Sequence, residues 1–154
     1  MQLYFLRHGE ADWPEWDRPD DERPLTVPGK KEVRKVADML GMLGTSLDQI
    51  VSSPLPRARQ TADIIAACLE VEIEEEKRLG HGFDVSALTS IVRKHRVGSL
   101  MIVGHEPAFT QVLFALTGGD CKLSKAGVAL VRLEPDDMKG RLLWLFPPKF
   151  ANLI

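Results

Sequence analysis

The sequence predicts an α/β fold, a three-layer αβα sandwich in which helices cover both faces of a mostly parallel central sheet. Short apolar runs alternate with segments whose apolar residues recur at helical spacing, which is the rhythm of successive β–α units. Two runs, Gln2–Leu6 and Leu100–Val103, are apolar almost throughout, as expected of strands covered on both faces. The chain has 154 residues, and we expect a single domain over residues 1–154.

Strands are predicted wherever such a run is bounded by turn residues. They lie at Gln2–Leu6, Gln49–Ser52, Val71–Glu74, Leu100–Val103, Val128–Leu133 and Leu142–Phe146, and the third is the weakest candidate. The last two can pair as a hairpin, because Asp136, Asp137 and Gly140 between them are typical turn residues.

Four helices are predicted between the strands. In the first, apolar residues recur from Val33 to Leu43, Thr26 can cap its start, Pro28 suits its first turn and Gly44 can end it. The other three are expected to open at Ser53-Pro54, near Val85 and at Pro107.

Composition excludes several classes of protein. A net charge of −2 gives no overall basic face for nucleic acid, and no apolar run approaches the ~18 residues of a membrane span. The N-terminus has no leader-like segment, and Cys68 and Cys121 form neither a disulfide framework nor a Cys-x-x-Cys metal motif. We therefore expect a cytoplasmic protein with no nucleic-acid or membrane partner.

Residues suited to phosphate chemistry follow three of the predicted strands. Arg7-His8-Gly9 ends the first, Ser53-Pro54 ends the second with Arg57 one helical turn later, and His105-Glu106-Pro107 follows the fourth. In open parallel α/β sheets, ligands bind outside the carboxyl ends of the strands. Two arginines, two imidazoles and two helix N-termini are therefore predicted to meet at one edge of the sheet.

An arginine beside a histidine suits phosphoryl transfer. The Arg7 guanidinium can make bidentate hydrogen bonds to phosphate, and a neutral nitrogen of His8 can attack phosphorus and carry the phosphoryl group. The transition state needs positioning and positive potential, which these side chains supply without a metal. We expect no metal or cofactor, since no two of the four histidines are spaced i, i+4 and the arginines would repel a cation.

Three motifs resemble the signatures of a known family. Arg7-His8-Gly9-Glu10, the run Ser53–Ala62 and Val103-Gly104-His105-Glu106 are similar to those of the histidine phosphatase superfamily, which includes phosphoglycerate mutases and acid phosphatases. Within it the chain is most similar to the small SixA-type phosphohistidine phosphatases. Those share its short length, the run Arg23–Thr26 followed by Gly29, and the lack of a large inserted cap.

The resemblance implies a phosphoglycerate mutase-like fold and assigns roles to four residues. His8 would be the phosphoryl acceptor, with Arg7, Arg57 and His105 binding the phosphate. Further candidates for substrate binding are Gly9, Ser53, Glu106 and His81.

Some of these candidates have alternative roles. Ser53 can be a helix N-cap, Glu10 and Glu106 can orient the imidazoles or arginines, and His81 can lie on a surface loop between two glycines. The segment Ala11–Pro24 is rich in acidic residues and prolines and contains Trp13 and Trp16. It is either a solvated loop or a rim of the site whose tryptophans meet a partner.

The lack of a recognisable general acid in the sequence bears on the substrate. Many family members carry a glutamate general acid after the third strand, and no residue of Glu76–Asp84 aligns with it. An alkyl phosphate expels a basic alkoxide and benefits from a proton donor, whereas phosphohistidine expels imidazole, whose conjugate acid has a pKa near ~6.5. The sequence thus favours phosphohistidine on a protein as substrate. A small phosphorylated molecule on the same site, or a non-catalytic phosphate- or phosphoprotein-binding module, is the alternative.

Overall fold

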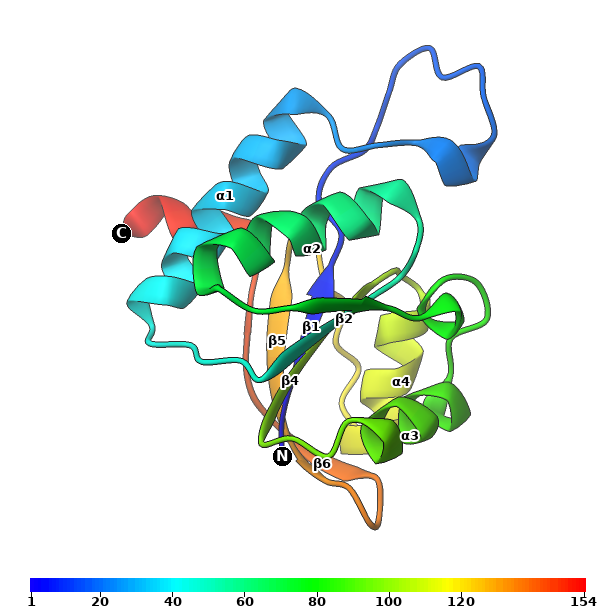
Figure 1. Ribbon diagram of the computed structural model, residues 1–154, viewed down its shortest axis with the longest axis vertical. Coiled ribbons are helices and arrows are strands. Elements are labelled where there is room, and N and C mark those ends of the chain that lie inside the picture. The colour runs from blue at the N-terminus through cyan, green and yellow to red at the C-terminus, as the bar shows by residue number, and fades with distance from the viewer.

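Six strands form one central sheet in the computed structural model, which describes residues 1–154 (Figure 1). They are β1 (Gln2–Arg7), β2 (Gln49–Ser52), β3 (Ile73–Glu75), β4 (Ser99–Gly104), β5 (Val128–Glu134) and β6 (Lys139–Phe146). Their order is β3-β2-β4-β1-β5-β6, in which the first four are parallel and β5 runs antiparallel to both β1 and β6. The mostly parallel sheet is confirmed, and so is the hairpin of the last two strands.

Helices cover both faces of this sheet. They are α1 (Val27–Met42), α2 (Pro56–Leu69), α3 (Val85–Lys94) and α4 (Ala108–Thr117), with short 3-10 helices η1 (Asp20–Glu22), η2 (Lys77–Leu79) and η3 (Pro148–Leu153). α1 and α2 lie on one face, and α3 and α4 lie on the other (Figure 1). The predicted three-layer αβα arrangement is therefore confirmed.

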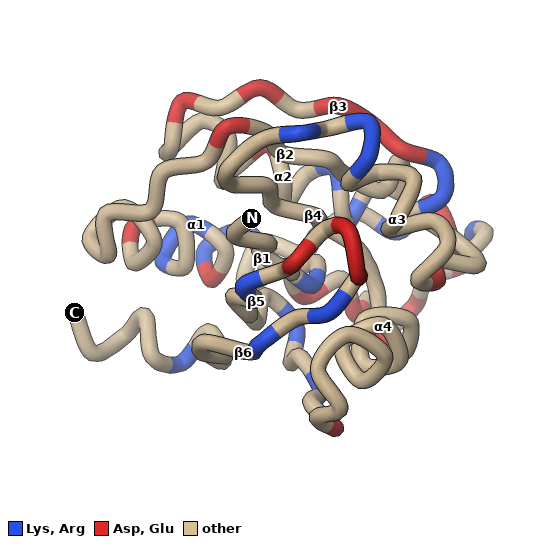
Figure 2. The backbone as a smooth tube through the Cα atoms, turned by 90° about the horizontal axis from the view of Figure 1, so that it is seen from below, with Lys and Arg blue, Asp and Glu red and all other residues tan.

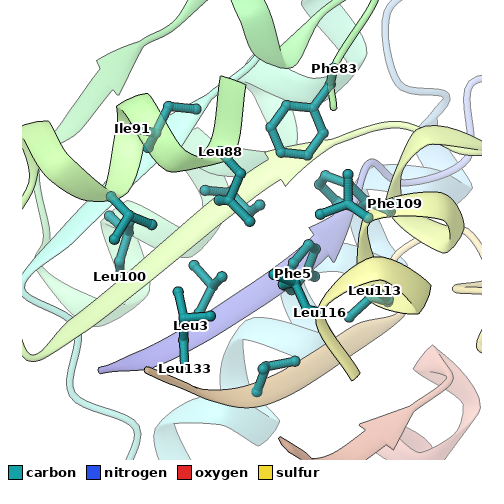
Figure 3. Close-up of a cluster of buried hydrophobic side chains, with 14 of the residues drawn as sticks. Leu3, Phe5, Phe83, Leu88, Ile91, Leu100, Phe109, Leu113, Leu116 and Leu133 are labelled. Carbon is teal, nitrogen blue, oxygen red and sulfur yellow. The ribbon is translucent and has the colours of Figure 1, made fainter. Parts of the chain in front are cut away.

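The apolar run of β1 contributes to two separate cores, because successive strand side chains point to opposite faces. Leu3 and Phe5 are fully buried on the side of α3 and α4 (Figure 3), whereas Tyr4 and Leu6 are buried on the side of α1 and α2. Phe5 meets Phe109 of α4 edge to face, with ring centroids 5.2 Å apart. Burial of each such side chain contributes roughly 1.5–3 kcal/mol, so both layers hold β1 in place.

α1 begins and ends as its sequence predicts. The Thr26 hydroxyl accepts a hydrogen bond of 3.1 Å from the Gly29 amide, which is the expected N-cap interaction. The helix ends at Met42, and Gly44 follows in the left-handed conformation with φ +71°.

α2 starts at Pro56 rather than at the predicted Ser53-Pro54. The Ser53 amide still bonds to the sheet, since it donates to the Val103 carbonyl at 2.9 Å. Its hydroxyl accepts a hydrogen bond of 3.2 Å from the Leu55 amide in a tight turn, and Leu55 is the N-cap without a capping side chain. The prediction of Ser53 as the N-cap is therefore wrong, because this serine belongs to the turn before the helix.

Some strands are longer than the apolar runs that predict them, because backbone pairing continues beyond the apolar residues. β1 and β4 pair up to Arg7 opposite Gly104, and β6 begins at Lys139 rather than at Leu142. Main-chain groups pair whatever the polarity of their side chains, so a hydrophobic pattern misses these ends. Because β4 lies between β1 and β2, the carboxyl ends of all three strands lie at the same edge of the sheet (Figure 1).

The opposite edge of the sheet is seen in Figure 2. Basic and acidic residues are interspersed there, and the β5–β6 connection carries both. None of the helices combines the length and apolar character that a membrane crossing requires.

Gly29 ties the start of α1 to the loop that leaves β1. A β-carbon at Gly29 would lie 2.2 Å from the Glu10 carbonyl oxygen, which itself accepts the Thr26 amide at 3.0 Å. We predict that Gly29→Ala lowers the free energy of unfolding by roughly 1–3 kcal/mol, because a backbone group cannot give way as a side chain can. Urea unfolding at equilibrium measures this change.

Gly41 in the same helix is the matched control. A β-carbon there would meet only Leu69 Cδ2, at 4.0 Å. Gly41→Ala should leave the stability unchanged or raise it by up to about 1 kcal/mol, as alanine favours helix. Equal effects of the two substitutions would contradict the close packing assigned to Gly29.

Candidate functional site

His8 is held at the end of β1 by its main chain. Its amide donates to the Gly104 carbonyl and its carbonyl accepts from the Ala126 amide, both at 3.0 Å. The next amide, that of Gly9, donates at 3.0 Å to the hydroxyl of Thr61 in α2. The position of His8 is thus set by β4, by the segment before β5 and by α2 together.

The His8 ring presents one nitrogen to the pocket. Its Nδ1 lies 2.7 Å from the Gly9 carbonyl oxygen, which can only accept, so Nδ1 carries the proton and Nε2 has the free lone pair. The ring is buried, and this burial lowers the pKa of His8 to about 4, with the positive charges of Arg57 and Arg7 acting in the same direction. At neutral pH the ring is therefore uncharged.

Two arginines lie near the carboxyl ends of β1 and β2. Arg7 is the last residue of β1, and the buried Arg57 belongs to α2, which follows β2. Arg7 Nη1 donates to the Leu123 carbonyl at 2.9 Å, and Arg57 Nη1 donates to the Asp20 carbonyl at 3.1 Å. The Nε atoms of both arginines are buried and have no partner within the protein. Such donors are costly to bury unsatisfied, and Arg57 also lies in the first turn of α2, where the helix dipole favours an anion. This arrangement suits an oxyanion.

His105 lies beside His8, with ring centroids 5.2 Å apart. Its Nε2 is 2.8 Å from the Ser53 hydroxyl oxygen, so Ser53 orients this ring. Burial lowers the pKa of His105 to about 3, and the positive charge of Arg57 acts in the same direction. At neutral pH, His105 contributes as a neutral hydrogen-bonding group rather than as a cation.

These side chains surround a pocket of about 360 Å³. Of the predicted site residues, Arg7, His8, Arg57, His81, His105 and Glu106 line it. Gly9 and Ser53 are not among the residues that line it: the Gly9 amide bonds to Thr61, and the Ser53 hydroxyl bonds to His105. The sequence reasoning did not assign Asp12, Asp20, Arg23 and Lys125 to the site, although they line it too.

The segment Ala11–Pro24 forms part of the pocket rim. Asp20 lies between Arg57 and Arg23, with its Oδ1 2.8 Å from Arg23 Nε. Asp12 pairs with Lys125, and Asp21 bonds to His81 Nε2 at 2.8 Å. The segment therefore lies at the rim of the pocket, and the contact of its tryptophans with a partner stays a prediction.

The two tryptophans of this rim pack together, with ring centroids 6.1 Å apart. The indole N–H of Trp13 donates to the Pro24 carbonyl and that of Trp16 to the Pro19 carbonyl, at 2.9 and 3.0 Å. Their polar atoms are thus used to brace the segment itself.

The carboxylates that line the pocket are engaged by neighbouring hydrogen-bond donors. A hydrogen bond from Lys125 holds the pKa of Asp12 below its usual range, and one from Arg23 does the same for Asp20. Both carboxylate oxygens of Glu106 accept hydrogen bonds from Thr110 and Leu123. Glu76, the first residue of the stretch Glu76–Asp84, lies outside the pocket, and a hydrogen bond from Arg78 lowers its pKa to about 2.

Comparison with known proteins agrees with this geometry. Residues 3–81 match the model of the histidine phosphatase superfamily (branch 1). An uncharacterised protein of Picosynechococcus sp. is 34% identical over 86% of this chain and 85% of its own length. The phosphohistidine phosphatase SixA of Escherichia coli is 27% identical over 96% of this chain and 94% of its own.

A solved structure gives the same result for the fold. The protein histidine phosphatase SixA, in complex with tungstate, superposes with a TM-score of 0.87 at 26% identity and covers 100% of both chains. Sequence, fold and pocket therefore agree: the chain is a phosphatase that belongs to the histidine phosphatase superfamily, branch 1.

Proposed function

We propose that residues 1–154 form one phosphohistidine phosphatase domain that works through a phospho-His8 intermediate. The observation that carries this proposal is the neutral His8 ring, with Nε2 free, beside two arginines whose buried Nε atoms lack partners. The named SixA relatives support phosphohistidine as the substrate class. The substrate would be a protein that carries phosphohistidine.

In the first step, His8 Nε2 attacks phosphorus in line as the bond from phosphorus to the leaving imidazole nitrogen breaks, and the substrate ring, protonated on its other nitrogen, departs as neutral imidazole. Arg7 and Arg57 hold the equatorial oxygens, and neutral His105 donates a hydrogen bond to them from Nδ1–H while its Nε2 accepts from the Ser53 hydroxyl. His8 needs no general base, because its ring is already deprotonated at Nε2 at neutral pH. The activation free energy of the attack is thus lowered because the two arginines and His105 position the phosphoryl group and the arginines stabilise its charge.

In the second step, water attacks the phosphorus of phospho-His8, the Nε2–P bond breaks, and inorganic phosphate leaves. The Gly9 carbonyl keeps the Nδ1 proton in place throughout, so the ring returns to the tautomer that began the cycle. The same two arginines stabilise both transition states.

The lack of a free acid in the pocket favours this substrate. Asp12 and Asp20 are held ionised by Lys125 and Arg23. An alkoxide leaving group would depart slowly from such a site, whereas imidazole leaves readily near neutral pH. We therefore infer selectivity for phosphohistidine over alkyl phosphates.

We predict that wild-type protein releases phosphate from a chemically phosphorylated histidine protein much faster than from an alkyl phosphate. His8→Ala should lower the first rate at least about 10³-fold, because the nucleophile is lost. Mass spectrometry of quenched wild-type protein should find one added phosphoryl group, which His8→Ala lacks.

His95→Ala serves as the histidine control, since His95 lies outside the pocket. Comparable rates on both substrates would instead indicate a general phosphomonoesterase. Binding of phosphoprotein without any release would indicate a binding module.

A second prediction concerns protonation. The folded-state pKa of about 4 lies below the usual 6.5, so protonation of His8 occurs only as the pH falls through about 4. The ring nitrogens of His8, observed by NMR in the free protein and assigned through His8→Ala, should stay neutral from pH 8 down to about 5. A titration midpoint near 6.5 would contradict the neutral-nucleophile mechanism.

A further inference from the structure

Glu106 makes contacts that link two parts of the site. Its Oε1 accepts a hydrogen bond of 2.7 Å from the Thr110 amide, and its Oε2 accepts one of 2.5 Å from the Thr110 hydroxyl. The same Oε2 accepts a third, of 3.0 Å, from the Leu123 amide, which is 17 residues away in the sequence. The carboxylate thus connects the start of α4 to the segment between α4 and β5.

Leu123 in turn contacts a phosphate-binding arginine. Its carbonyl accepts the 2.9 Å hydrogen bond from Arg7 Nη1, and its side chain is fully buried. This is the hydrogen bond that fixes the direction of the Arg7 guanidinium, whose Nε is buried without a partner. Leu123 therefore accepts a hydrogen bond from Arg7 at its carbonyl and donates one to Glu106 from its amide.

Helix capping accounts for only part of this arrangement. Pro107 is the N-cap residue of α4 and has no capping side chain, so Glu106 supplies the acceptor for the Thr110 amide in its place. That role does not require the contact with Leu123. The Leu123 contact instead anchors the segment on which Arg7 depends.

We propose that Glu106 is a positioning residue that acts through Leu123 to aim the Arg7 guanidinium at the phosphoryl oxygens. Glu106 itself neither donates a proton nor binds the substrate. Without it, the segment that carries Leu123 loses one of its fixed points and Arg7 loses its orientation. The inference rests on the proposed function in one respect, namely that Arg7 binds the phosphoryl group.

Tungstate, a phosphate-like oxyanion, tests the proposal without any turnover. Calorimetry would measure its dissociation constant for wild type, Glu106→Ala, Arg7→Ala and the double variant. We expect Glu106→Ala to weaken binding about 10-fold, the size of one charge-assisted hydrogen bond. In the Arg7→Ala background the same change should have no further effect, because there is no guanidinium left to aim.

If Glu106→Ala and Arg7→Ala weaken tungstate binding independently, so that the two factors multiply in the double variant, the proposal is overturned. A wild-type protein that fails to bind tungstate would overturn the proposed function as well. A normal tungstate affinity in Glu106→Ala would overturn the positioning role alone, so the two failures are distinguishable.

Thr110→Val is the matched control. It removes the Thr110 hydroxyl from Glu106 Oε2 but leaves the contact with Leu123. Tungstate affinity should stay within about twofold of wild type. A loss as large as that of Glu106→Ala would show that the contact with the Thr110 hydroxyl, and not the contact with Leu123, carries the effect, and would overturn the proposal.

Arginine side-chain NMR provides a readout specific to Arg7. On addition of tungstate, the Nε–H signals of Arg7 and Arg57 should both shift in the wild type. In Glu106→Ala only the Arg7 signal should lose this response, because Arg57 is held separately by Asp20. Equal losses at both arginines would indicate general damage and overturn the proposal.

Glu106→Gln and Arg7→Lys provide a milder pair in case Glu106→Ala does not fold. The amide side chain of Glu106→Gln would keep one acceptor oxygen, so the expected loss of affinity lies between those of wild type and Glu106→Ala. The same non-additivity is expected when Glu106→Gln is combined with Arg7→Lys.

Discussion

The pairing of β1 with β4 determines the geometry of the whole site. Arg7 lies opposite Gly104, and the His8 amide bonds to the Gly104 carbonyl, so the residues that follow these strands, His8 and His105, emerge side by side. A shift of this register by one residue would turn His8 to the opposite face and exchange the side chains that fill the two cores. The same apolar residues that stabilise the sheet therefore also set the distance between the imidazole rings.

Bringing two arginines together in the site costs desolvation and repulsion energy, and contacts with other parts of the chain offset this cost. Arg57 and the Nε atom of Arg7 are withdrawn from water, and both imidazoles are neutral chiefly because they are buried themselves, with Arg57 acting in the same direction. Asp20 compensates Arg57 from the rim, while the Leu123 carbonyl receives Arg7. The pocket thus keeps unpaired Nε donors that suit an anion, while each guanidinium also has a partner within the protein.

Sequence reasoning located most of the site because its motifs are local. Arg7, His8, Arg57 and His105 each follow a recognisable strand or open a helix, and all four line the pocket. Lys125 lies in an irregular segment with no motif, and only the tertiary fold brings it to the rim beside Asp12. The role of Ser53 was also missed, because its partner His105 is 52 residues away and no local pattern reports such a contact.

The positions of the three tryptophans have a consequence for the fluorescence of the protein. Trp13 and Trp16 are packed against each other on the segment whose Asp20 contacts Arg57, whereas Trp144 stacks on Phe146 in β6, with ring centroids 4.8 Å apart. We expect an anion that draws Arg57 away from Asp20 to change the surroundings of the first two indoles more than those of the third. Tryptophan fluorescence of the rim would then follow occupancy of the pocket, with Trp144 in the sheet as an internal reference.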